Sequence, residues 1–139
     1  IEYAQLHGSE DAAYIEALRK RTALLGKTAK IIKTVKVGST ADLENISEID
    51  CEYLLLDAWS KEGEAAGGNG RTFEWSLIKA LEKPFFLAGG LTVDNVQQAV
   101  RMTSPYGIDA SSCMETEDCK DLNKMKAFAQ AVRVNETNN

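Results

Sequence analysis

The sequence predicts an α/β fold with a parallel sheet, and two observations lead to this prediction. Short apolar runs of strand character alternate with helix-like segments along most of the chain. The spacing between successive runs leaves room for a crossover helix, which parallel strands require. The chain contains no internal repeat and no linker-like tract, so residues 1–139 are expected to form a single domain.

The first unit consists of a strand over 3–7 and a helix over 11–25. Ser9 is expected to cap the helix, because a serine oxygen accepts a hydrogen bond from an amide of the first turn. The acidic residues after Ser9 lie near the positive end of the helix dipole. Gly26 follows at the position where glycine commonly ends a helix.

Two further strands precede a glycine-rich segment. Residues 29–37 are rich in β-branched side chains, which favour strands, and a short polar helix is expected over 39–44. The run at 53–57 is apolar up to its last residue, which suits a strand buried on both faces. Residues 61–72 contain four glycines and are expected to form a loop.

The remaining elements continue the alternation. They are a helix over 74–81, a strand over 85–88, a helix over 94–102, a strand over 107–111 and a helix over 121–134. In the first of these helices, the shared face is expected to hold Trp75, Ile78 and Leu81. In the last helix, the apolar side is expected to hold Leu122, Met125, Phe128, Ala129 and Val132.

Such βα units fit either an open doubly wound sheet or a (β/α)8 barrel. A dinucleotide-binding open sheet carries a G-x-G-x-x-G turn after its first strand, whereas the first turn here is only Gly8-Ser9. The turns that could hold a phosphate follow the last two strands, as is common in TIM barrels. A closed barrel usually needs roughly 200–250 residues, so we expect a partial barrel of about five βα units.

Composition excludes several classes of function. A net charge of −5 and a pI near 4.9 argue against a general nucleic-acid binder. No apolar run is long enough to cross a membrane. Three cysteines and one histidine make a zinc site improbable, and reduced thiols in a cytoplasmic protein are expected.

Asp57 is the first candidate for chemistry. It ends the Leu54-Leu55-Leu56 strand, so its carboxyl is expected at the mouth of an apolar strand. Desolvation there raises the pKa of a carboxylic acid and makes it a usable general acid. The alternative is that Asp57 only caps the turn or pairs with a lysine.

Two turns are candidates for holding a phosphate. Gly89-Gly90 allows a close approach of the backbone to an anion, and a helix opening near Thr92 would point amides at it. Ser111-Ser112 offers hydroxyls and amides beside that turn. The alternative for each is an ordinary tight turn.

Other polar residues follow the same strand ends. Gln5, His7 and Asp109 are expected at the rim. A lone histidine at a strand end, such as His7, is more often a structural or substrate-contacting group than a catalytic base. The 67–71 segment is either a lid over the site or a flexible connector.

These motifs, in this order, resemble phosphoribosylanthranilate isomerases. The similarity covers almost the whole chain and rests on Gln5-Leu6-His7-Gly8, Leu54 to Asp57, Gly67 to Trp75, Leu87 to Val96, Tyr106 to Ser112 and Lys120-Asp121.

The resemblance implies an isomerase of tryptophan biosynthesis. It would catalyse the Amadori rearrangement of N-(5-phosphoribosyl)anthranilate to 1-(2-carboxyphenylamino)-1-deoxyribulose 5-phosphate, with neither cofactor nor metal. Asp57 matches the general acid. The positions that match the binding site of the substrate phosphate are Gly89, Gly90, Ser111 and Ser112. The other substrate-site positions are Gln5, His7 and Asp109.

The chain departs from the family pattern in two respects. By resemblance it supplies strands four to eight, without the cysteine base of the first strand or the arginine of the second. Cys51 precedes its strand at the wrong end to replace that base. A complementing N-terminal segment or self-association is therefore expected. Cys113 stands where the family usually has glycine, which would be costly if that position needs a positive φ.

Two other functions stay open. A non-catalytic phosphate-ligand-binding or assembly module would keep the glycine and serine turns without the base. Another phosphosugar enzyme on a similar barrel is the third possibility.

Overall fold

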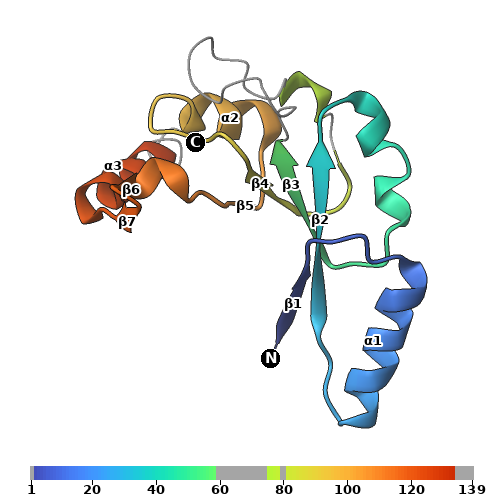
Figure 1. Ribbon diagram of the computed structural model, residues 1–139. Helices are drawn as coiled ribbons and strands as arrows, with labels where there is room; N and C mark the ends of the chain where they lie inside the picture. The colour runs from blue at the N-terminus through green and yellow to red at the C-terminus, as the bar shows by residue number, and fades with distance from the viewer. Residues whose placement is uncertain (1, 59–74, 79–80, 134–139) are drawn as a thin grey trace.

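The computed structural model describes residues 2–58, 75–78 and 81–133. One parallel sheet organises the described chain, and its strands lie side by side in the order of the sequence. The strands are β1 (Tyr3–Leu6), β2 (Lys30–Val37), β3 (Tyr53–Ala58), β4 (Phe85–Ala88) and β5 (Gly107–Ile108) (Figure 1). The predicted α/β fold with a parallel sheet is therefore confirmed, and the strand order does not reverse as it would in a doubly wound sheet.

Three α-helices accompany the sheet in the described residues. They are α1 (Ala12–Leu24), α2 (Val96–Thr103) and α3 (Leu122–Arg133). Helix α1 lies at the β1 and β2 end of the sheet, and α2 and α3 lie at the β4 and β5 end (Figure 1). Short 3-10 turns fill the connections: η1 (Thr40–Leu43), η2 (Ile46–Glu48), η3 (Trp75–Leu77) and η4 (Ser112–Met114). A hairpin of β6 (Glu115–Thr116) and β7 (Cys119–Lys120) precedes α3.

One face of the sheet is buried. Side chains of a strand alternate between the two faces, and those of Ile31, Leu54, Leu56 and Leu87 are at most 1% exposed. The helices add the other half of this core, with Ile15, Val96, Ala99 and Phe128. The same cluster therefore joins all three helices to the sheet.

The opposite face of the sheet is more open. Leu55 is buried there, in agreement with the prediction that β3 is covered on both sides. Tyr3, Tyr53, Phe86 and Tyr106 form a row of ring contacts near the amino ends of the strands, with centroids 5.1–6.1 Å apart. Tyr3 and Tyr106, at the two sides of this row, are 43% and 65% exposed.

The first helix differs from the prediction at its start. Asp11 caps α1, not Ser9, because its carboxylate accepts a hydrogen bond from the Tyr14 amide at 2.8 Å. Its end agrees with the prediction: Gly26 has a φ of +66°, and its amide donates to Ala23 O. Both ends thus satisfy backbone groups that a helix leaves unpaired.

The predicted helix over 74–81 is wrong for the residues described there. Trp75–Leu77 form a 3-10 turn, and Ile78 lies outside regular structure. Trp75 and Ile78 are nonetheless both 5% exposed. A 3-10 turn has three residues per turn, so positions i and i+3 share a side and the apolar spacing suits it as well. The 61–72 loop, with its possible lid, lies outside the described residues.

Other elements are shorter than expected. The polar helix over 39–44 is a 3-10 turn, α2 begins at Val96, and β5 ends at Ile108. In α3, Phe128 is buried, but Leu122 and Met125 are 70% and 38% exposed. The predicted apolar side of α3 is therefore only partly covered. Among the described elements, α3 packs mainly on α2 and η4.

No helix in the described part of the chain is long and apolar enough to span a bilayer.

Leu54→Ala tests the buried face. Leu54 is 0% exposed, so the substitution should lower the free energy of unfolding by about 2–5 kcal/mol, since it removes buried apolar surface and leaves a cavity. Leu24→Ala is the matched control, because Leu24 is 86% exposed and its loss should cost less than about 0.5 kcal/mol. Chemical denaturation of both variants measures the difference; equal losses would contradict the assigned core.

Candidate active site

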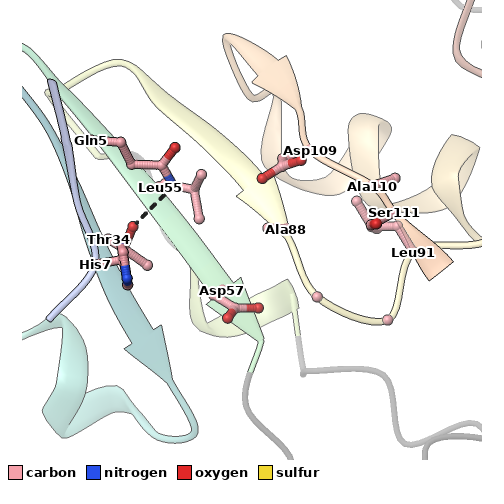
Figure 2. Close-up of a pocket in the computed structure, with 12 residues that line it drawn as sticks. Gln5, His7, Thr34, Leu55, Asp57, Ala88, Leu91, Asp109, Ala110 and Ser111 are labelled. Carbon is pink, nitrogen blue, oxygen red and sulfur yellow. Dashed lines mark hydrogen bonds between the residues drawn. The ribbon is translucent and has the colours of Figure 1, made fainter. Parts of the chain in front are cut away.

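A cavity of about 310 Å³ opens at the carboxyl ends of the five strands. Figure 2 shows the side chains around it, including Gln5 of β1, Thr34 of β2, Asp57 of β3 and Asp109 after β5. Gly89, Gly90, His7 and Ser111 also line it. The structure thus brings together every residue predicted for the site except Ser112, which begins η4 outside the lining.

Parallel register places these groups at successive levels of the sheet, two residues apart along each strand. Asp57 pairs with Ala88 of β4, and Thr34 pairs with Leu55 of β3. The Asp109 amide continues the ladder beyond β5 by donating to Leu87 O at 2.9 Å. Residues at the same level of neighbouring parallel strands point to the same face, so the side chains converge above the open face of the sheet.

Asp57 is half-buried, and its pKa is raised. Burial is the main cause, because it disfavours the charged carboxylate, and the nearby Asp109 carboxylate adds to the effect. Lys36, which pairs with Asp57 in the β2–β3 ladder, acts in the opposite direction. The environment therefore shifts the carboxyl towards its protonated form, the direction expected from the sequence.

The turn after β4 depends on glycine. Gly89 and Gly90 have φ values of +85° and +62°, in the left-handed region where a Cβ is unfavourable. Asn95 fastens this turn: its side chain accepts from the Thr92 amide at 2.8 Å and donates to Gly90 O at 3.0 Å. The Thr92 amide is thereby engaged within the turn itself.

The serine turn after β5 differs in its two residues. Ser111 lines the cavity, whereas Ser112 and Cys113 turn into η4. Cys113 is half-buried against the core and does not adopt a positive φ. The expected backbone cost of a cysteine at this position is therefore not found.

The turn after β1 is held by a partly buried ion pair. The Lys33 ammonium donates to Gly8 O at 2.7 Å and to the Glu10 carboxylate at 2.8 Å. The Glu10 carboxylate in turn accepts from the Gly8 amide. These bonds fix the chain next to His7, whose side chain is exposed at the rim.

Sequence reasoning missed five lining residues. They are Thr34, Leu55, Ala88, Leu91 and Ala110. Leu55 lies two residues before Asp57 and Ala88 directly before Gly89, so strand alternation and chain proximity were usable signals. Thr34 had no such signal, because its place beside Gln5, with Gln5 Nε2 3.5 Å from Thr34 Oγ1, depends on pairing between strands.

The cysteines lie away from the cavity lining. All three thiols are free, and Cys51 is buried ahead of β3, at the amino end of the strand. Burial raises the pKa of Cys51 and of Cys113, which makes each thiol a weaker nucleophile at neutral pH. Within the described residues, no group of three or more His, Cys, Asp or Glu side chains could hold a metal ion.

This geometry suits acid catalysis on an anionic substrate. A carboxyl shifted towards its protonated form faces a cavity, and a glycine turn and a serine border the same cavity. The carboxyl can donate a proton, while turns of this kind can bind a phosphate group.

Comparison with known proteins identifies the family. The family model described as N-(5'phosphoribosyl)anthranilate (PRA) isomerase matches residues 1–131. The N-(5'-phosphoribosyl)anthranilate isomerase of Acetivibrio thermocellus is 41% identical over 140 residues, and that of Endomicrobium trichonymphae is 39% identical over 133. In both cases the alignment covers 96% of this chain and 62% of the relative.

Solved structures agree. The phosphoribosyl anthranilate isomerase of Thermotoga maritima superposes with a TM-score of 0.77 at 30% identity, over 96% of this chain and 62% of that one. The enzyme of Thermococcus kodakaraensis gives a TM-score of 0.72 at 31% identity, over 95% and 63%. A third structure, of a phosphoribosyl anthranilate isomerase in complex with reduced 1-(o-carboxyphenylamino)-1-deoxyribulose 5-phosphate, gives a TM-score of 0.70 at 26% identity, over 96% of this chain and 60% of that one.

The chain thus spans about three fifths of the length of the curated relatives it matches. Since the family model covers nearly all of it, the chain belongs to the N-(5'-phosphoribosyl)anthranilate isomerase family.

Proposed function

We propose that the protein isomerises N-(5-phosphoribosyl)anthranilate to 1-(2-carboxyphenylamino)-1-deoxyribulose 5-phosphate, a step of tryptophan biosynthesis. The observation that carries the proposal is Asp57. Its half-buried carboxyl has a raised pKa and faces the cavity at the carboxyl ends of the strands. The family match over residues 1–131 supports the same reaction.

In this proposal Asp57 is the general acid. The reaction begins when an acid protonates the ring oxygen of the furanose, which opens the ring to a Schiff base. A base then removes the proton from C2, and the enamine rearranges to the amino-ketose. A carboxyl that holds its proton closer to neutral pH is better suited to the first step than an ordinary aspartate.

The substrate phosphate binds at the other side of the cavity. Gly89, Gly90, Ser111 and Ser112 are the residues proposed to hold it. Support comes from the two positive-φ glycines, which let the backbone approach an anion, and from Ser111 in the lining. The isomerase solved with a reduced 5-phosphate compound is a relative whose ligand carries the same group. Gln5, His7 and Asp109 complete the proposed substrate contacts at the rim.

The five strands are proposed to be strands four to eight of an eight-stranded barrel that forms one domain. The sequential strand order supports this assignment, and among the described residues no further strand pairs with the edges at β1 and β5. Tyr3, in β1, and Tyr106, directly before β5, are exposed at these two edges. A further segment would cover them and supply the cysteine base and the arginine for the anthranilate carboxylate. The free thiols accord with a reducing cytoplasmic setting, which is part of the proposal.

One observation favours a second function for the chain acting by itself. None of the three cysteines is part of the described lining of the cavity. A module that binds a phosphate ligand without turnover would need only the glycine and serine turns. The two functions differ in what Asp57 contributes: turnover depends on it, whereas phosphate affinity does not.

Asp57→Asn tests the general acid. In the whole protein, turnover of N-(5-phosphoribosyl)anthranilate should fall by about 10²–10⁴-fold in kcat, because asparagine cannot donate the proton. Asp118→Asn is the matched control: Asp118 is exposed in the β6–β7 turn, and asparagine tolerates its φ of +60°. A kcat of Asp57→Asn within threefold of the control would reject Asp57 as the acid.

The pH dependence of stability tests the environment of Asp57. A carboxyl whose folded pKa is raised costs stability as pH rises through that pKa, so Asp57→Asn should be more stable than the parent at pH 7. The advantage should shrink as pH falls towards the ordinary pKa of aspartate, about 3.9.

Asp42→Asn provides a control of opposite sign. Hydrogen bonds from the Gly38 amide, the Ser39 hydroxyl and the Ser39 amide lower the pKa of Asp42, so this variant should be less stable at pH 7. Thermal unfolding between pH 4.5 and pH 8 measures both trends. If Asp57→Asn unfolds at a lower temperature than the parent at pH 7, the Asp57 carboxyl is not desolvated as proposed.

Size-exclusion chromatography tests the completing segment. A polypeptide of residues 1–139 alone should self-associate, since open edges of a parallel sheet and an uncovered aromatic row favour association. Co-expression with the first three βα units of the Acetivibrio thermocellus isomerase should yield a one-to-one complex. A compact monomer of residues 1–139 that does not bind the added units would count against the partial barrel.

A further inference from the structure

The β6–β7 hairpin places a lysine against the serine of the cavity rim. Lys120 Nζ lies 2.8 Å from Ser111 Oγ and 3.3 Å from Ser111 O, to both of which it donates. The same ammonium pairs with Glu115 Oε1 at 2.5 Å. Ser111 is the residue of this cluster that lines the cavity (Figure 2).

The hairpin turn brings Lys120 to this position. Glu117 and Asp118 have φ values of 49° and 60°, as the two central residues of a type I′ turn require. This turn sets Lys120 directly opposite Glu115 in the β6–β7 ladder. Asp121 then ties the hairpin to η4 and α3: its amide donates to Met114 O, and its carboxylate accepts from Thr116 Oγ1 at 2.9 Å.

The bonds of Lys120 determine what the Ser111 hydroxyl can do. A serine hydroxyl has one hydrogen to donate and two lone pairs to accept with. Lys120 occupies one lone pair, and the hydrogen has only a long bond of 3.3 Å to Glu115 Oε1. Glu115 already accepts the short bond from Lys120, so the hydrogen can be redirected to a phosphate oxygen at small cost.

Charge gives Lys120 a second role. A carboxylate at Asp109, which also lines the described cavity, repels a phosphate. Glu115 lies beside Ser111, and its pKa is lowered, chiefly by the hydrogen bond from Lys120. Without Lys120, an uncompensated carboxylate would stand next to the phosphate and would compete for the Ser111 hydrogen.

We propose that Lys120 is a positioning residue of the phosphate subsite, which keeps the Ser111 hydroxyl available as a donor and neutralises Glu115. The inference rests on the proposed function, because it presumes that Ser111 binds the substrate phosphate. It assigns a role to the Lys120-Asp121 motif, which the catalytic scheme leaves without one.

Binding of inorganic phosphate to the whole protein, measured by calorimetry, tests this role. Lys120→Met should weaken binding about 3- to 10-fold at low salt, a range that allows for the half-exposed ion pair. The loss should shrink in added NaCl, because salt screens the charges. Lys120→Arg and the double variant Lys120→Met/Glu115→Gln should each recover most of the affinity.

Lys124→Met is the matched control. Lys124 carries the same charge and fastens the same hairpin, but it donates to the backbone oxygen Glu115 O, at 2.6 Å, and not to Ser111. Its loss should change phosphate affinity by less than about twofold. In turnover, Lys120→Met should raise KM and leave kcat within about twofold, since the residue acts on binding alone.

The outcomes separate the inference from the function on which it rests. If the parent protein binds no phosphate, or Ser111→Ala binds it as well as the parent, the proposed phosphate subsite fails. If Ser111→Ala weakens binding but Lys120→Met does not, or Lys124→Met weakens it equally, the role of Lys120 is overturned. If Lys120→Met does not fold, the double variant Lys120→Met/Glu115→Gln, which removes both charges, tests the same role. A phosphate affinity of the double variant below one tenth of the parent's would reject the proposal.

Discussion

Parallel pairing of five strands over one buried face is the constraint on which the rest of the structure depends. Each of the fully buried side chains Leu54, Leu56 and Leu87 contributes about 1.5–3 kcal/mol by leaving water. Because side chains alternate, a shift of β3 by one residue would turn Leu56 towards the cavity and Asp57 into the core. The burial that stabilises the sheet therefore also sets which groups reach the open face, and the register sets their level.

At Asp57, the proposed acid, this constraint costs stability. Asp57 stands where the apolar strand meets the cavity, so its carboxyl loses water while Lys36 compensates for it only in part. A neutral side chain at position 57 would be buried at a smaller free-energy cost, which is why Asp57→Asn is expected to be more stable and less active. Such a conflict between stability and activity is common at sites that perform acid chemistry.

The turns around the cavity are all held by side-chain hydrogen bonds to their backbone. Lys33 fastens the turn after β1 through Gly8 O, Asn95 fastens the turn after β4 through Gly90 O, and Lys120 fastens the turn after β5 through Ser111. In each case a side chain on a neighbouring element donates to the carbonyl of the turn. Loops that bind a ligand lose less entropy on binding when the scaffold has already ordered them.

The five strands of the parallel sheet, the α/β class and most of the candidate site could be predicted from the sequence, because these follow from short windows of residues. Apolar runs such as 85–88 read as strands, and the candidate site residues Asp57, Gly89 and Ser111 lie at or shortly after the carboxyl ends of strands. Local chemistry did not choose between Ser9 and Asp11 as the cap of α1, since both side chains can accept from an early amide. Tertiary structure alone decided the place of Thr34, the exposure of Leu122 and the contact of Lys120 with Ser111. Each of these depends on packing or pairing between segments that the chain brings together only on folding, which no local pattern encodes.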